Sequence, residues 1–254
     1  MKAHSNSSAG EPAVLAELIQ QHSLDPLRKA ARDLRLTEDL ALALLERRDL
    51  PHQVIEDLTK NMAVMKHRRV INAVVIHPRT PRHVSLPIAR RLYNFELMQI
   101  TLLPTVTADL KMFAEEQLIN RVETISAGER LALAKRGSTR IAAALLLDAE
   151  ARVIEAALHN PYMTDRWIVK AVLDDDAPQA LIDALCRDSK WSLRREVRAA
   201  LLRNEKTPLA RVVAFAESMS SMALREILLH SRLPRNVKEY LQKILEQRPL
   251  GIKS

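Results

Sequence analysis

The stretch VINAVVIHPRTPRH, residues 70–83, decides the fold. An apolar run with helical spacing stops at Pro78, and a Thr-Pro pair, Thr80 and Pro81, precedes the next run. Proline has no backbone N–H and a fixed φ, so it ends one helix and is accepted at the first turn of the next. The stretch therefore predicts a helix, a tight break and a second helix, with the Thr80 hydroxyl capping the second helix.

The same pattern recurs along the chain. Prolines that open a new apolar run align in one column, and an apolar pair stands six and seven residues before each of them. The aligned prolines are Pro51, Pro81, Pro104, Pro208 and Pro234, with Thr207 in the place of Thr80 before Pro208. The apolar pairs are Leu44 and Leu45, Val74 and Val75, Leu97 and Met98, Leu201 and Leu202, and Ile227 and Leu228. Consecutive spacings of 30, 23 and 26 residues suit one pair of short helices per unit, so we expect the apolar pairs to be buried.

Composition favours a helical repeat fold. Apolar residues make up 47% of the 254 residues, whereas aromatic residues reach only 3% and glycine occurs 4 times, which argues against all-β and Rossmann-type folds. Short amphipathic helices are marginal alone and need neighbours that bury their apolar faces. The sequence therefore predicts an all-α protein: an α-solenoid of sixteen or seventeen helices, stacked as short antiparallel pairs in about eight repeats.

The solenoid is expected to be a single domain over residues 12–248. Residues 1–11 are polar and small and predict a disordered N-terminal tail, and residues 249–254 predict a C-terminal tail. No apolar run is long enough for a membrane span or a secretory signal. The single cysteine, Cys186, is expected to be a buried apolar side chain, which together with the missing signal favours a cytoplasmic location.

Residues 105–150 depart from the pattern. They keep the helical spacing but lack the prolines after Pro104, so breaks are expected instead at ISAGERL, residues 125–131, and at RGSTRIAAAL, residues 136–145. The repeat register of this section is left open.

Two of the breaks carry a family resemblance. HPRTPRHV, residues 77–84, and HNPYMTDRW, residues 159–167, resemble the variant leucine-rich repeat of the HEAT-like class, whose units pass through an Asn-Pro-x-Thr-Pro turn. The resemblance covers most of residues 37–247 and implies a scaffold that binds other molecules. The variant repeats pair α-helices with 3₁₀ helices. At Pro87 this implies a short 3₁₀ piece and a new helix capped by Ser85, whereas the residues alone also allow a kink.

No catalytic or cofactor motif accompanies the repeats. HExxH, GxSxG, GxGxxG and a Walker phosphate loop are all missing from the sequence. His77, His159 and His230 directly precede breaks and are expected at helix C-termini, where imidazole interacts with the helix dipole, rather than around a metal. LDDDAP, residues 173–178, lacks the spacing of a calcium loop and is interpreted as a turn in which Asp176 caps the next helix. We therefore predict no enzyme activity, no metal and no cofactor.

The positive charge is concentrated. Net charge is +8, and residues 64–100 carry seven Lys or Arg against one Asp or Glu. These seven residues are the candidate binding residues: Lys66, Arg68, Arg69, Arg79, Arg82, Arg90 and Arg91. Arg79 and Arg82 are expected at the rim of a break. Together with one of Arg90 and Arg91 they would contact an acidic partner, unless the block is only a solvated face.

Three functions remain open. The first is a non-enzymatic scaffold that binds a protein or peptide partner on its concave or rim surface. The second is nucleic-acid binding, in which the basic block neutralises phosphates. The third follows from a resemblance to HEAT-like DNA glycosylases, for which the candidate residues are Asp165, Trp167, Trp191, Arg194 and Arg195. The scarcity of aromatic side chains counts against this last function, since a flipped nucleotide is held by stacking.

Overall fold

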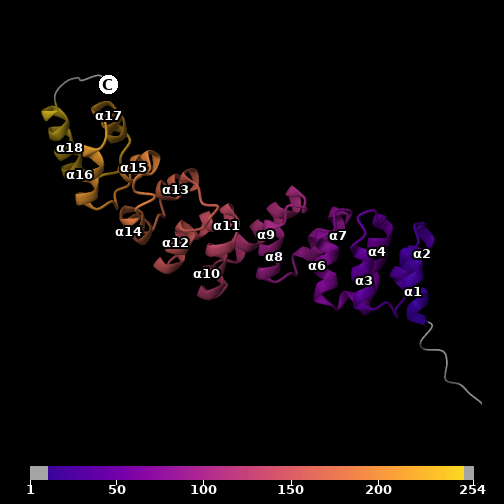
Figure 1. Cartoon of the computed structure of the whole chain (residues 1–254). Helices are drawn as coiled ribbons and strands as arrows, with labels where there is room; N and C mark the ends of the chain where they lie inside the picture. Colours follow the sequence, from indigo (N-terminus) through magenta and orange to yellow (C-terminus); the bar gives the residue numbers. More distant parts are fainter. Residues whose placement is uncertain (1–10, 249–254) are drawn as a thin grey trace, which may run out of the picture. The chain divides into compact units, whose positions relative to one another are not determined.

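The computed structural model describes residues 11–248, and this range is entirely helical. It contains eighteen α-helices, one short 3₁₀ helix and no β-strand (Figure 1). The predicted all-α class is therefore confirmed for these residues. Of the predicted tails, residues 1–10 and 249–254 lie outside the described range, whereas Glu11, which was assigned to the N-terminal tail, is the first residue of α1. The chain divides into two compact units, residues 1–120 and 121–254, which are described separately.

In the first unit, helices that are not adjacent along the chain contact one another. Helix α1 packs against α2 and α3, α3 packs against α6, and α2 packs against α4, while α6 also contacts α7. The helices of this unit are α1 (Glu11–Gln20), α2 (Leu24–Arg32), α3 (Glu38–Leu45), α4 (His52–Lys60), α5 (Met62–Met65), α6 (Arg68–Ile76), α7 (Arg82–Ala89), α8 (Asn94–Leu102) and α9 (Ala108–Arg121), whose last residue belongs to the second unit.

The second unit shows two rows of helices. Helices α10, α12 and α14 contact one another in succession, as do α11, α13 and α15, and α18 closes the unit against α16 and α17. Its helices are α10 (Ala127–Arg136), α11 (Thr139–Ala144), the 3₁₀ helix η1 (Leu145–Leu147), α12 (Ala151–Leu158), α13 (Asp165–Val172), α14 (Gln179–Arg187), α15 (Arg195–Leu201), α16 (Leu209–Glu217), α17 (Ser221–Leu229) and α18 (Arg235–Gln247).

The apolar pairs identified in the sequence form part of the core. All ten side chains are buried, and the most exposed of them, Leu228, keeps 8% of its surface accessible. Cys186 is also buried, at 3%, as expected, and burial raises the pKa of its thiol to about 11. The spacing of apolar residues therefore identified the buried faces of these helices.

Prolines begin helices as predicted, but they take the N-cap position rather than the first helical turn. Pro51, Pro81, Pro208 and Pro234 are the N-cap residues of α4, α7, α16 and α18. Each proline carbonyl accepts a hydrogen bond from the amide three residues later, at 2.9–3.0 Å. A proline φ near −60° is compatible with this extended N-cap conformation.

The threonines before these prolines do not cap the following helix, so that prediction was wrong. The Thr80 hydroxyl donates to the Val74 carbonyl and the Thr207 hydroxyl to the Leu201 carbonyl, both at 2.6 Å. These carbonyls belong to the last turn of the preceding helix, where the backbone lacks helical partners. The hydroxyls therefore close the helix before the break.

Pro104 belongs to a different column from the one predicted. Helix α8 ends at Leu102 and α9 begins only at Ala108, so Pro104 lies inside the turn. Pro104 instead matches Pro78. The residue before each proline, Leu103 or His77, has a carbonyl that accepts the amide hydrogen of the residue three positions further on, Val106 or Thr80. Thr107 accordingly takes the place of Pro81. The hydrogen bonds of the turn, not the proline itself, determine where the next helix begins.

Two other local predictions were wrong. Helix α7 is α-helical from Arg82 through Pro87 to Ala89, with neither a 3₁₀ piece nor a new helix at Ser85, which is buried inside it. Helix α14 is preceded by Pro178, and Asp176 does not cap it. The breaks expected in residues 125–145 are confirmed: Ser126 caps α10, with a reciprocal bond to Glu129, and Ser138 precedes α11.

Four buried polar side chains each connect a turn to a turn 23–32 residues earlier in the chain. We call this set, Asn61, His77, Asn160 and Asn204, the turn ladder; each is at most 9% exposed. Every member accepts a hydrogen bond from the backbone amide two residues later, at 2.8–3.2 Å. Every member also has a ring or amide nitrogen within 2.7–3.1 Å of a backbone carbonyl 23–32 residues earlier, on Ala31, Asp33, Arg47, Ala134, Gly137 and Val172.

The ladder satisfies carbonyls that the helix ends leave without helical partners. A buried carbonyl without a hydrogen bond destabilises the fold by about 1–3 kcal/mol, and the three asparagines remove such cases at Ala31, Ala134, Gly137 and Val172. The Asp33 and Arg47 carbonyls also accept the amides of Leu36 and Leu50. Because each ladder bond joins the ends of two helices that pack together, the ladder also fixes the register between those helices.

The ladder predicts a measurable loss of stability. Asn160→Ala should lower the free energy of unfolding by about 2–3 kcal/mol, since it leaves the Ala134 and Gly137 carbonyls and the Tyr162 amide unpaired. Urea denaturation would measure it. Asn236→Ala, on an exposed asparagine of α18, is the matched control and should change stability by no more than about 0.5 kcal/mol. Equal effects of the two substitutions would contradict the role of the ladder.

Truncation of core side chains should also lower the free energy of unfolding. Val74→Ala and Leu201→Ala each truncate a fully buried side chain and should cost about 2–4 kcal/mol. Pro208→Ala should cost about 1 kcal/mol or less, because this N-cap proline acts mainly by restricting the unfolded chain. Thermal and urea unfolding of the three variants would test the order; a larger effect at Pro208 than at Leu201 would contradict it.

Candidate functional site

The seven basic candidates lie where the sequence predicted, in the first unit. Lys66 follows α5, Arg68 and Arg69 begin α6, Arg79 lies in the turn, Arg82 begins α7, and Arg90 and Arg91 follow it. Their environments differ, and the structure separates those held by other side chains from those open to solvent.

Arg68 is committed to an internal contact. Its guanidinium donates to both carboxylate oxygens of Glu96, and its carbon Cζ lies 4.1 Å from the centre of the Tyr93 ring. Glu96 also accepts from Asn72 Nδ2 at 2.9 Å and from the Tyr93 amide at 2.7 Å. Burial by itself would raise the pKa of the Glu96 carboxyl, but the Arg68 hydrogen bonds and the other donors outweigh burial and lower it. Arg68 therefore has a structural role.

Arg82 and Arg90 are engaged less strongly. Arg82 Nη1 lies 3.0 Å from Asp109 Oδ2, and both side chains are largely exposed. Such exposed pairs contribute little to stability and can exchange partners. Arg90 lies with Cζ 5.9 Å from the centre of the Phe113 ring. Neither residue is as firmly held as Arg68.

The remaining candidates are open to solvent. The Arg69 side chain is 71% exposed, and its Nη1 lies 3.8 Å from a Glu38 oxygen, a long distance for an ion pair. Lys66, Arg79 and Arg91 are exposed, and their side chains form no ion pair within residues 11–248. The basic block is therefore not one uniform surface: Arg68 is held by Glu96, whereas Lys66, Arg79 and Arg91 have no ion pair among the described residues.

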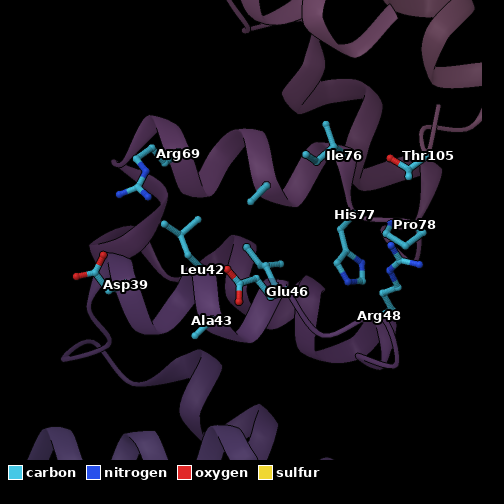
Figure 2. A pocket seen from close by; sticks show the side chains of 12 residues that line it. Asp39, Leu42, Ala43, Glu46, Arg48, Arg69, Ile76, His77, Pro78 and Thr105 are labelled. Atoms are coloured by element: carbon cyan, nitrogen blue, oxygen red, sulfur yellow. The ribbon is translucent and has the colours of Figure 1, made fainter. Parts of the chain in front are cut away.

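A pocket of about 810 Å³ lies between α3 and α6, next to Arg69 (Figure 2). Leu42, Leu45, Ala73 and Ile76 supply its apolar walls, from the facing sides of two helices that pack against each other. Its full lining is Asp39, Leu42, Ala43, Leu45, Glu46, Arg48, Arg69, Ala73, Ile76, His77, Pro78 and Thr105. We call this feature the α3–α6 groove.

The groove has charged ends. Figure 2 shows Asp39 and Arg69 at one end, and Arg48 beside His77 and Pro78 at the other. Arg48 is exposed and has no ion pair with any residue in the described range, whereas its neighbour Arg47 is fixed by the carbonyls of Ile19 and Gln21. An apolar centre between unpaired charges can hold a ligand that has both apolar and charged groups.

The turn ladder positions the Arg48 end of the groove. His77 Nδ1 accepts the Arg79 amide hydrogen, so Nε2 carries the ring hydrogen and donates to the Arg47 carbonyl. This bond places the turn that contains Arg48 beside the turn that contains Arg79. Both ring nitrogens of His77 are occupied, which leaves the ring no free position for proton transfer or metal binding.

The other two histidines occupy the predicted helix ends. His159 and His230 are the C-cap residues of α12 and α17, and their Nδ1 atoms lie 2.7 and 3.3 Å from the carbonyls of Glu155 and Glu226. Within residues 11–248 no group of three His, Cys, Asp or Glu side chains is arranged to hold a metal ion.

The residues considered for a glycosylase do not offer two stacking platforms. Trp191 is 2% exposed and its indole N–H donates to the Leu158 carbonyl at 3.0 Å. Trp167 is half-buried on α13, with Lys170 Nζ 5.5 Å from the ring centre. Arg194 and Arg195 are exposed beside α15. Trp191 therefore acts as a core side chain.

Of the seven candidates predicted from the sequence, Arg69 lines the groove; Arg48, Asp39 and Glu46 also line it and were not among the candidates. The charge count pointed to residues 64–100, because acidic residues are scarce there, whereas Arg48 lies in a segment whose charges nearly balance. Arg48 becomes apparent only from the hydrogen bond between His77 and the Arg47 carbonyl, which brings the two turns together.

Comparison with known proteins returns no relative. The chain matches no protein-family model, no curated protein and no solved structure. Among the described helices none has the length and apolar character needed to cross a membrane.

The lowered pKa of Glu96 predicts acid sensitivity. A carboxyl whose pKa is lower in the folded state stabilises the fold above its unfolded value, about 4.3, and loses this contribution as the pH falls through its folded pKa. Glu96→Gln should therefore cost about 1–3 kcal/mol near pH 7, and the difference from wild type should disappear near pH 2. Denaturant titrations at several pH values would measure it. Glu116→Gln, on an exposed residue of α9, should show no such difference, and a constant difference across pH would contradict the assignment.

Proposed function

We propose that this chain is a non-enzymatic helical repeat scaffold of the HEAT-like class. Its two units would be parts of one α-solenoid domain over residues 12–248. Contacts between helices two places apart, the recurring turn and the turn ladder support this proposal, since stacked helix pairs require such contacts. The scaffold binds a protein or peptide partner.

One observation carries the proposed activity: the α3–α6 groove has apolar walls and ends in unpaired charges. Its volume of about 810 Å³ is enough for several side chains of a bound peptide. The groove follows two helices of eight and nine residues. An apolar peptide segment with an acidic residue at the Arg48 end fits this surface, because Arg48 and Arg79 lie on adjacent turns there.

A peptide partner is favoured over nucleic acid. Phosphate contacts dominate nucleic-acid binding, and they need several free cations along one track. Of the seven basic candidates, Arg68 is fully committed to Glu96 and Arg82 is paired with Asp109. Asp39 and Glu46 in the groove would repel a phosphate backbone. The burial of Trp191 likewise disfavours a glycosylase.

Selection from a displayed random peptide library would test the proposal. We expect apolar peptides with acidic residues, and a selected peptide should bind Ala43→Glu at least about tenfold more weakly, because a carboxylate on the exposed groove residue repels it. Arg48→Glu with Arg79→Glu should weaken binding similarly without lowering the thermal midpoint.

Ala132→Glu is the control for Ala43→Glu. Ala132 is also an exposed helical alanine, on α10, and glutamate is nearly as favourable as alanine in helices, so both variants should fold. Equal affinity of Ala43→Glu and Ala132→Glu would contradict the groove as the site. Tight DNA binding that falls steeply with salt, and is lost in Arg79→Glu with Arg91→Glu, would favour the nucleic-acid function instead.

A further inference from the structure

A second pocket, in the second unit, is lined by three arginines. It has a volume of about 550 Å³ and lies between α15 and α17. Arg195, Arg198 and Arg203 line it, together with Glu196 and Glu226. This pocket shares no residue with the α3–α6 groove, so it is independent of the proposed function.

The three arginines differ in how they are held. Arg198 is fixed, since its Nε donates to the Ser192 carbonyl at 2.6 Å and Nη1 to the Ser218 hydroxyl at 3.0 Å. Arg195 is exposed and unpaired within the described range. The Nε of Arg203 is buried, and no described residue accepts its hydrogen. No side-chain hydrogen bond or ion pair joins Arg203 to a described residue, so its guanidinium, like that of Arg195, is available to an anionic group in the pocket.

The net charge of the pocket indicates which anionic group it would bind. Three arginines and two glutamates give the lining a formal charge of +1. A carboxylate carries one negative charge and matches this value, whereas a phosphate dianion would exceed it and would lie near Glu196 and Glu226. Guanidinium groups also bind carboxylates through paired, parallel hydrogen bonds.

Apart from Ser218 and Ser220, the remaining lining residues are apolar. Leu193, Ala199, Met219, Ala223 and Ile227 form the other walls, and Leu193 is 68% exposed. Such a large exposed side chain beside a charged pocket can cover the apolar body of a ligand.

We propose that the α15–α17 pocket binds a monocarboxylate with an apolar body. The carboxylate pairs with Arg203 and Arg195, Arg198 supports it from its fixed position, and the apolar body lies against Met219 and Leu193. Such a group is present in a free carboxylic acid and at the C-terminus of a peptide that ends in an apolar residue.

Titration calorimetry or NMR titration of the full chain would test this site. The probes are hexanoate and a short peptide ending in leucine with a free carboxylate, and the controls are hexan-1-ol, the amidated peptide and inorganic phosphate. At least one carboxylate probe should bind with a Kd of about 1 mM or tighter, and at least about tenfold tighter than its neutral counterpart and than phosphate. The tighter of the two probes identifies the source of the carboxylate.

Arg203→Met should weaken binding of that probe at least about tenfold and should not lower the thermal midpoint, because the Nε has no partner to lose. Arg225→Met, on an exposed arginine of α17 that does not line the pocket, is the control. If Arg203→Met does not fold, Arg195→Met provides the same test. No saturable binding of either carboxylate up to about 10 mM, equal binding of the neutral probes or of phosphate, or unchanged affinity in the arginine variant would overturn the proposal.

Discussion

The hydrogen-bonding needs of the helix ends constrain most of this structure. Each short helix leaves carbonyls without partners at its C-terminus, and many of these ends are buried. Asn61, His77, Asn160 and Asn204 each donate a hydrogen bond to a carbonyl at the end of an earlier helix, while accepting an amide hydrogen of their own turn. One side chain thus shapes a turn and connects it to its neighbour. Apolar burial holds the helices together, but it is less directional, and the ladder gives them a register.

The same hydrogen bonds position the groove. The bond between His77 and the Arg47 carbonyl places two turns side by side, with Arg48 on one and Arg79 on the other. Helices α3 and α6, which these turns follow, then present Leu42 and Ala73 to the same space. The apolar walls and the charged ends of the groove therefore lie on two packed helices and the turns that follow them. Exposed side chains line the groove, whereas the ladder that positions its turns is buried.

The two pockets differ in their physical character. The α3–α6 groove is mainly apolar, and its charges lie at its ends, which suits a peptide segment. The α15–α17 pocket places three arginines beside a smaller apolar wall, and two of them, Arg195 and Arg203, have no ion pair within the described residues. Each unit thus offers a separate surface, and separate variants can test each one.

The sequence by itself determined the helical class, the buried apolar pairs and several of the breaks between helices, because apolar spacing and proline act locally. All ten residues of the apolar pairs are buried, and the break at Thr80–Pro81 lies where it was expected. Sequence could not decide what the turn side chains bond to. Thr80 closes the preceding helix instead of capping the next, and Pro104 matches Pro78 instead of Pro81. From the sequence, Arg68 was expected to be a free cation, and Arg48 was not among the candidate binding residues. Partners such as Glu96 for Arg68 and the Arg47 carbonyl for His77 lie 28 and 30 residues away along the chain, so only the tertiary structure brings them together.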